Sequence, residues 1–129
     1  MKGYLLDTHI LLWWIGDAEK LHRNVFNTIS DNSNKIYISS ASIWEIAIKE
    51  ALGKLKVNGD LESIIEVNNF LELKISARCA SATKKLEKIH RDPFDRILIA
   101  QAIENDLTLI TIDKYIKQYS GVELLTWHH

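Results

Sequence analysis

The sequence has little cysteine, little proline and no excess of basic residues, and each scarcity excludes a class of protein. The single cysteine, Cys79, cannot form an intramolecular disulfide or a thiolate zinc site, which excludes a disulfide-held secreted scaffold. With one proline and five glycines in 129 residues, no Pro- or Gly-rich linker appears, so we expect one domain over residues 1–129. Apolar runs such as residues 10–15 are far shorter than the ~20 residues that span a bilayer.

The charge balance excludes a broad basic surface for nucleic acid. Lys and Arg number 16 and Asp and Glu number 17, which gives a formal net charge of −1. Hydrophobic residues make up 47% of the chain, enough for an ordinary globular core. The first residues lead directly into an apolar run without a signal-peptide pattern, so we expect a cytoplasmic protein.

Apolar periodicity predicts strands that alternate with helices. We expect strands at 4–6, 36–38, 70–75, 107–112 and 122–126, and helices at 11–15, 19–31, 42–55, 60–70, 77–89 and 92–105. This alternation is typical of an α/β sandwich with a mostly parallel central sheet. Ligands bind such sheets at the carboxyl ends of the strands, where Asp7 and Asp113 are predicted to lie.

Each candidate acid also has an ordinary structural interpretation. Asp7 can cap the helix that follows it, or it can bind a metal with support from the Thr8 hydroxyl. Glu45 completes a capping box with Ser42, or it points a carboxylate at a metal. Lys49 follows Glu45 by four residues, so it can pair with that carboxylate or contact a phosphate.

The densest polar cluster spans residues 90–96. Asp92 before Pro93 favours an N-cap, which places Asp95 in the first turn of a helix where an acid is stabilised by the helix dipole. Asp113 can cap the segment 114–119, and Thr111 shares its face of the strand.

Together, the four acids Asp7, Glu45, Asp95 and Asp113 are predicted to meet at one rim of the sheet. Grouped carboxylates repel one another unless a cation neutralises them, and a site of oxygen ligands suits Mg²⁺ or Mn²⁺. The histidines form no convincing zinc set in the sequence, and we expect the terminal pair 128–129 to be disordered, whether native or the remnant of a tag.

The ordered set of motifs resembles the PIN-domain ribonucleases, above all the VapC-like toxins of bacterial toxin–antitoxin pairs. The matching segments are DTH at 7–9, SIWEI at 42–46, DPFDR at 92–96 and TID at 111–113. The resemblance implies a three-layer PIN-like sandwich with a parallel five-stranded sheet, a homodimer, an antitoxin partner and Mg²⁺- or Mn²⁺-dependent cleavage of RNA.

The resemblance also assigns residues. Its acidic, metal-binding and catalytic positions fall on Asp7, Glu45, Asp95 and Asp113, and its supporting hydroxyls fall on Thr8 and Thr111. We add Lys49, Arg91 and Arg96 as candidate phosphate contacts.

Two other functions compete with this interpretation. An aspartyl-phosphate phosphatase also places Asp after its first strand, but it needs a second acid where this chain has His9. A non-catalytic PIN-like or receiver-like binding module would need no complete acid set, although all four acids are present here.

Overall fold

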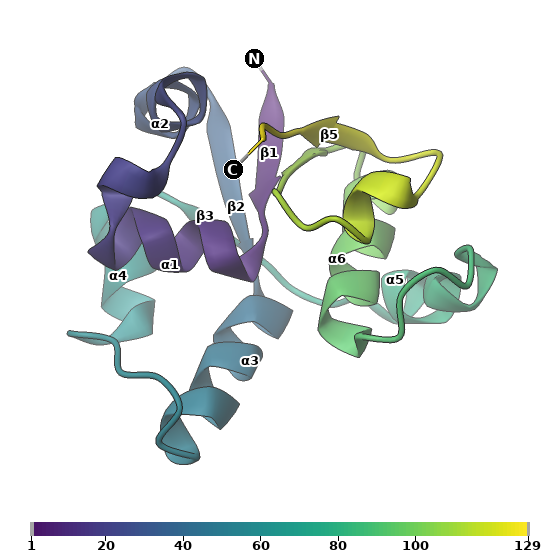
Figure 1. The fold of residues 1–129 in the computed structure, drawn as a ribbon, viewed down its shortest axis with the longest axis horizontal. Helices are drawn as coiled ribbons and strands as arrows, with labels where there is room; N and C mark the ends of the chain where they lie inside the picture. The colour runs from purple at the N-terminus through teal and green to yellow at the C-terminus, as the bar shows by residue number, and fades with distance from the viewer. Residues whose placement is uncertain (1, 129) are drawn as a thin grey trace.

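The computed structural model describes residues 2–128, and a parallel sheet of five strands forms its centre (Figure 1). The strands are β1 (Gly3–Leu6), β2 (Lys35–Ser39), β3 (Leu71–Leu73), β4 (Thr108–Ile110) and β5 (Glu123–Leu125). They lie in the order β3-β2-β1-β4-β5, and every neighbouring pair is parallel. The α/β fold class predicted from the alternation of strands and helices is therefore confirmed.

Within residues 2–128, six α-helices flank this sheet. They are α1 (Thr8–Gly16), α2 (Arg23–Ser30), α3 (Ser40–Ala51), α4 (Leu61–Val67), α5 (Ala77–Ala82) and α6 (Pro93–Glu104). Helices α1, α2 and α4 lie on one side of the sheet, and α5 and α6 lie on the other (Figure 1). Among residues 2–128, no helix has both the length and the apolar character needed to cross a membrane.

The sheet buries one hydrophobic core on each face, because successive side chains of β1 point in opposite directions. Leu5 packs with Leu98 and other residues of α6, whereas Leu6 packs with Ile10 of α1 and Ile46 of α3. All five of these side chains are fully buried. The central strand is thus fixed from both sides, and the residue that follows it is held in a defined place.

Several predicted elements have different bounds in the structure. The helix expected at 42–55 begins at Ser40, because the Ser39 hydroxyl caps it by accepting a hydrogen bond from the Ala41 amide at 3.0 Å. The helix expected at 19–31 is a short 3-10 turn, Ala18–Lys20, followed by α2. The helix expected at 77–89 ends as α5 at Ala82 and continues only as a 3-10 turn, Thr83–Lys85.

The strand order creates a crevice next to β1. From β1 the chain builds outward to β2 and β3 on one side, and it later returns to place β4 and β5 on the other side. Side chains at the carboxyl ends of β1 and β4 therefore face the point where the direction of winding reverses, which is where such sheets bind ligands. His128 is exposed and lies outside the helices and strands, and His129 lies outside the described residues.

Candidate functional site

The four predicted acids lie together in one cavity of about 310 Å³ beyond the carboxyl ends of β1 and β4. Its lining also includes a lysine, a further acid, a histidine, a hydroxyl and two aliphatic side chains. The complete lining is Asp7, Thr8, His9, Leu12, Glu45, Lys49, Asp92, Asp95, Ile112 and Asp113. The sequence prediction that strand ends and helix starts bring these acids to one rim agrees with this arrangement.

Asp7 both caps a helix and faces the cavity. Its amide donates a hydrogen bond to the carbonyl of Ile110 at 3.0 Å, so it extends the pairing of β1 with β4. Its Oδ1 accepts from the His9 amide at 3.2 Å, and its Oδ2 accepts from the Thr111 hydroxyl at 2.5 Å. Burial raises the pKa of Asp7 above its ordinary value, aided by the charge of Asp113 and opposed by the two hydrogen bonds.

Asp113 is linked to Asp7 through Thr111. Its amide donates to the Thr111 hydroxyl at 3.0 Å, so one threonine oxygen contacts both acidic residues. Asp113 Oδ1 accepts from the amides of Tyr115 at 2.8 Å and Ile116 at 3.0 Å, which confirms its predicted role at the start of the next segment. This turn fixes the backbone of Asp113 beside the cavity.

The start of α6 supplies two more carboxylates. Asp92 Oδ1 accepts from the Phe94 amide at 2.9 Å, which confirms Asp92 as the N-cap. Asp95 lies in the first turn, as predicted, and its side chain is 13% exposed. Burial raises the pKa of Asp95 to about 7, together with the negative charges of Asp7 and Asp92, against a hydrogen bond from His90 that lowers it.

Glu45 does not form the predicted capping box. The N-cap of α3 is Ser39, so Glu45 lies in the second turn, and Ser42 instead accepts a hydrogen bond from the Thr8 hydroxyl at 2.8 Å. The Oε2 atom of Glu45 accepts from Lys49 Nζ at 3.0 Å, which is the expected ion pair. Its Oε1 atom is buried and has no hydrogen-bond partner among residues 2–128.

This unpartnered oxygen is available to a cation or a water in the cavity. A buried carboxylate oxygen without a partner is costly, and the cost disappears if the atom binds a positive ion. Glu45 is 9% exposed and shares its cavity with Asp7, Asp95 and Asp113. A set of carboxylate oxygens is the donor chemistry that Mg²⁺ and Mn²⁺ prefer, so the residues present fit a divalent cation.

The predicted basic residues are divided between different places. Lys49 lines the cavity, and Arg91 lines an adjoining hollow of about 450 Å³ that shares Glu45, Lys49 and Asp92 with it. Arg96 is not brought to either lining. Its guanidinium donates to the main-chain carbonyls of residues 83, 87 and 90, at 2.8, 2.9 and 3.2 Å, and so it holds the loop before α6.

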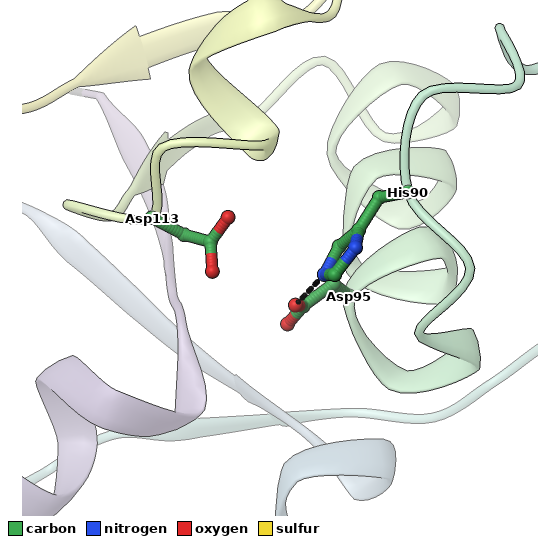
Figure 2. Close-up of side chains that lie close together, drawn as sticks. All are labelled: His90, Asp95 and Asp113. Atoms are coloured by element: carbon green, nitrogen blue, oxygen red, sulfur yellow. Dashed lines mark hydrogen bonds and ion pairs between the residues drawn. The ribbon is translucent and has the colours of Figure 1, made fainter.

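His90 is a residue of this site that sequence reasoning missed. Its Nε2 lies 2.8 Å from Asp95 Oδ2, and ligand atoms of His90, Asp95 and Asp113 all lie within 4.8 Å of one another (Figure 2). The histidines form no convincing zinc set in the sequence, and so His90 was not assigned to the site. The available signal was its place five residues before Asp95, in the densest polar cluster of the sequence.

Comparisons with known proteins agree with this site and fold. The family model for the PIN domain matches residues 4–122. Ribonuclease VapC22 of Mycobacterium tuberculosis (strain ATCC 25618 / H37Rv) is 24% identical over 123 residues, covering 92% of this chain and 93% of that protein.

Two solved structures have the same fold. VapBC2 from Rickettsia felis, bound to a DNA fragment from its promoter, superposes with a TM-score of 0.73 at 23% identity, over 98% of this chain and 99% of that one. DNA-bound VapBC from Salmonella typhimurium gives a TM-score of 0.69 at 20% identity, over 99% of this chain and all of that one (100%). Because the family model covers nearly the whole chain, this protein belongs to the PIN-domain family.

Proposed function

We propose that this chain is a metal-dependent endoribonuclease that hydrolyses RNA phosphodiesters and acts as the toxin of a toxin–antitoxin pair. One observation carries the proposal. Four carboxylates meet in one cavity at the switch point of a PIN-domain sheet, and a buried oxygen of Glu45 lacks a partner there. Such a group of acids is poorly suited to hold an RNA phosphate unless a cation lies between them.

The metal site of this proposal consists of Asp7, Glu45, Asp95 and Asp113. Their oxygens favour Mg²⁺ or Mn²⁺ as the ion. When bound, the cation supplies Lewis-acid polarisation of the phosphodiester and lowers the pKa of the attacking water. Thr111 keeps Asp7 in place, because its hydroxyl donates to Oδ2 of that carboxylate.

The remaining polar groups orient substrate and water. Glu45 Oε1, an acceptor without a protein partner among the described residues, is the oxygen of Glu45 that remains available to the cation or its bound water. Lys49 holds the other oxygen of Glu45 and is 46% exposed, so its ammonium also reaches toward a phosphate. Arg91, at the adjoining hollow, extends this positive charge to the next nucleotide. Thr8 ties α1 to α3 through Ser42 and supports the cavity wall.

The biological part of the proposal is supported by the relatives. The curated relative is a VapC ribonuclease, and the solved structures of this fold include VapBC complexes. We therefore propose RNA as substrate, a cognate antitoxin as protein partner, a homodimer as the assembled state and the cytoplasm as the place of action. Co-expression with any small reading frame found next to the gene, followed by purification through a tag on this chain, tests for an antitoxin.

The decisive experiment measures cleavage of a labelled RNA with Mg²⁺, with Mn²⁺ and with EDTA. Cleavage that requires the metal and disappears in Asp7→Asn supports the proposal, provided that circular dichroism shows a folded variant. His9→Gln is the matched control, because His9 lines the same cavity but is exposed. Full cleavage by folded Asp7→Asn would overturn the assignment of Asp7.

The same assay separates the two competing functions. A small aryl phosphate in place of RNA detects an aspartyl-type phosphatase. A protein that binds metal but cleaves neither substrate is a binding module.

A further inference from the structure

We propose that His90 is a nitrogen ligand for a divalent cation held between Asp95 and Asp113, and that this ligand makes the site select Mn²⁺ over Mg²⁺. The inference rests on the metal site of the proposed function, and it adds a residue and a preference that the four carboxylates alone do not supply. An imidazole among oxygen ligands changes the donor set in a way that binding experiments can measure.

The three side chains come from different elements and converge on one point. Asp95 belongs to α6, His90 lies in the loop that precedes it, and Asp113 lies in the loop after β4. Figure 2 shows the imidazole and the Asp95 carboxylate side by side, with the Asp113 carboxylate turned toward them across a gap. Ligand atoms of all three lie within 4.8 Å of one another, which leaves room for an ion between them.

The ring of His90 is held in place before any ion arrives. It stacks on Tyr115 with a centroid distance of 4.7 Å and an interplanar angle of 16°, and its side chain is only 19% exposed. Its main chain is held as well, because its amide donates to the Tyr119 hydroxyl at 2.9 Å and its carbonyl accepts from Arg96 at 3.2 Å. A ligand that is already ordered loses little conformational entropy when it binds a metal.

A second observation points to an ion in this cavity. Glu45 is 9% exposed, lines the same cavity as Asp95 and Asp113, and presents the buried oxygen Oε1 without a partner among the described residues. His90 alone offers one contact to Asp95, at 2.8 Å, and leaves the charge of Asp113 and the open oxygen of Glu45 uncompensated. A divalent cation between Asp95 and Asp113 compensates the charge of Asp113 and adds positive charge to the cavity that Glu45 also lines.

The choice of metal follows from ligand chemistry. Mg²⁺ binds oxygen ligands and keeps its waters, whereas imidazole is a good ligand for first-row transition metals. Replacing one oxygen of an acidic site by an imidazole nitrogen therefore favours Mn²⁺ relative to Mg²⁺. Metal binding uses the lone pair of His90 Nε2, so the ring proton then lies on Nδ1 and the hydrogen bond to Asp95 Oδ2 is given up.

Pulsed electron paramagnetic resonance of Mn²⁺ added to the metal-free protein tests this inference directly. We expect electron spin-echo modulation from a coordinated imidazole ¹⁴N in the wild-type protein. The modulation should vanish in His90→Gln and persist in His9→Gln, whose imidazole is exposed and outside the three-residue group. The hydrogen bonds of His90 to Tyr119 and Arg96 use its main chain, so they remain in the variant.

Calorimetric titration supplies the second measurement. His90→Gln should weaken Mn²⁺ binding by about tenfold or more and Mg²⁺ binding by less than about threefold. Equal losses of Mn²⁺ and Mg²⁺ affinity in His90→Gln would show that His90 only positions Asp95. In the resonance experiment, wild-type protein without ¹⁴N modulation would overturn the assignment of His90 as a ligand. RNA cleavage measured in parallel distinguishes failure of this inference from failure of the proposed nuclease function. Cleavage by a protein that shows no nitrogen coordination would rule out His90 as a ligand and still support the nuclease function.

Discussion

Replacing Asp95 by asparagine should stabilise the metal-free protein while removing its response to metal. The pKa of Asp95 is raised from 3.8 to about 7, first by burial and then by the charges of Asp7 and Asp92. As pH rises from about 4 to about 7, the unfolded chain has lost this proton and the folded chain still holds it. The free energy of unfolding therefore falls across this interval and stays low above it.

The size of the effect follows from the same pKa. A pKa raised by about 3 corresponds to at most about 4 kcal/mol at pH 8. Water reaches part of this carboxylate, so we expect about 1–2 kcal/mol after screening. For a chain of this length, a change of 1 kcal/mol in the free energy of unfolding shifts the melting temperature by about 4 °C. Asp95→Asn should therefore melt about 4–8 °C higher than the wild-type protein.

Thermal unfolding in EDTA at pH 8 and pH 5, followed by circular dichroism, measures this shift. At pH 5 the wild-type carboxyl is mostly neutral, so the difference between the two proteins should nearly disappear. Added Mg²⁺ at 100 times its dissociation constant should stabilise the wild-type protein by about 2.7 kcal/mol, and Asp95→Asn far less. Glu66→Gln, an exposed acid-to-amide change on α4, is the control. An Asp95→Asn protein that melts no higher than wild type at pH 8 would refute the proposed repulsion.

Two further predictions concern the same group of acids. Thr111→Val removes a buried hydroxyl that donates to Asp7 and accepts from the Asp113 amide. Urea unfolding should therefore show that the free energy of unfolding falls by about 1–3 kcal/mol. An unchanged urea midpoint would contradict this role of Thr111. The raised pKa of Asp95 makes protons compete with metal for this carboxylate. Calorimetry should therefore find that Mg²⁺ affinity falls by up to about tenfold for each pH unit below pH 7 and is constant above it. A constant affinity from pH 6 to pH 8 would exclude Asp95 as a ligand.

Local sequence patterns were sufficient for the parts of the site that depend on strand ends. Asp7 and Asp113 follow apolar strands, and parallel strands in a crossover fold end at one edge, so their meeting follows from topology. The cap at Asp92 was equally local, because an acid before a proline is a strong helix start. These features need no knowledge of the loops.

Other parts depended on contacts that sequence spacing does not specify. The capping box around Glu45 was wrong because Ser39 caps α3 by accepting from the Ala41 amide, and the helix begins two residues earlier than expected. The place of His90 depends on the loop before α6, whose path is set by Arg96 binding three carbonyls of that loop. No helical or strand periodicity encodes such a path, so the place of His90 could not be predicted from periodicity.

The hydrogen bond between Thr111 and Asp7 has a consequence for synthesis of the protein, because its partners are 104 positions apart. In the folded chain β1 pairs with β2 along one edge and with β4, which is made much later, along the other. Asp7 therefore has neither Thr111 nor Asp113 beside it until those residues have been made. The acid group of the proposed metal site is thus incomplete until synthesis has passed residue 113.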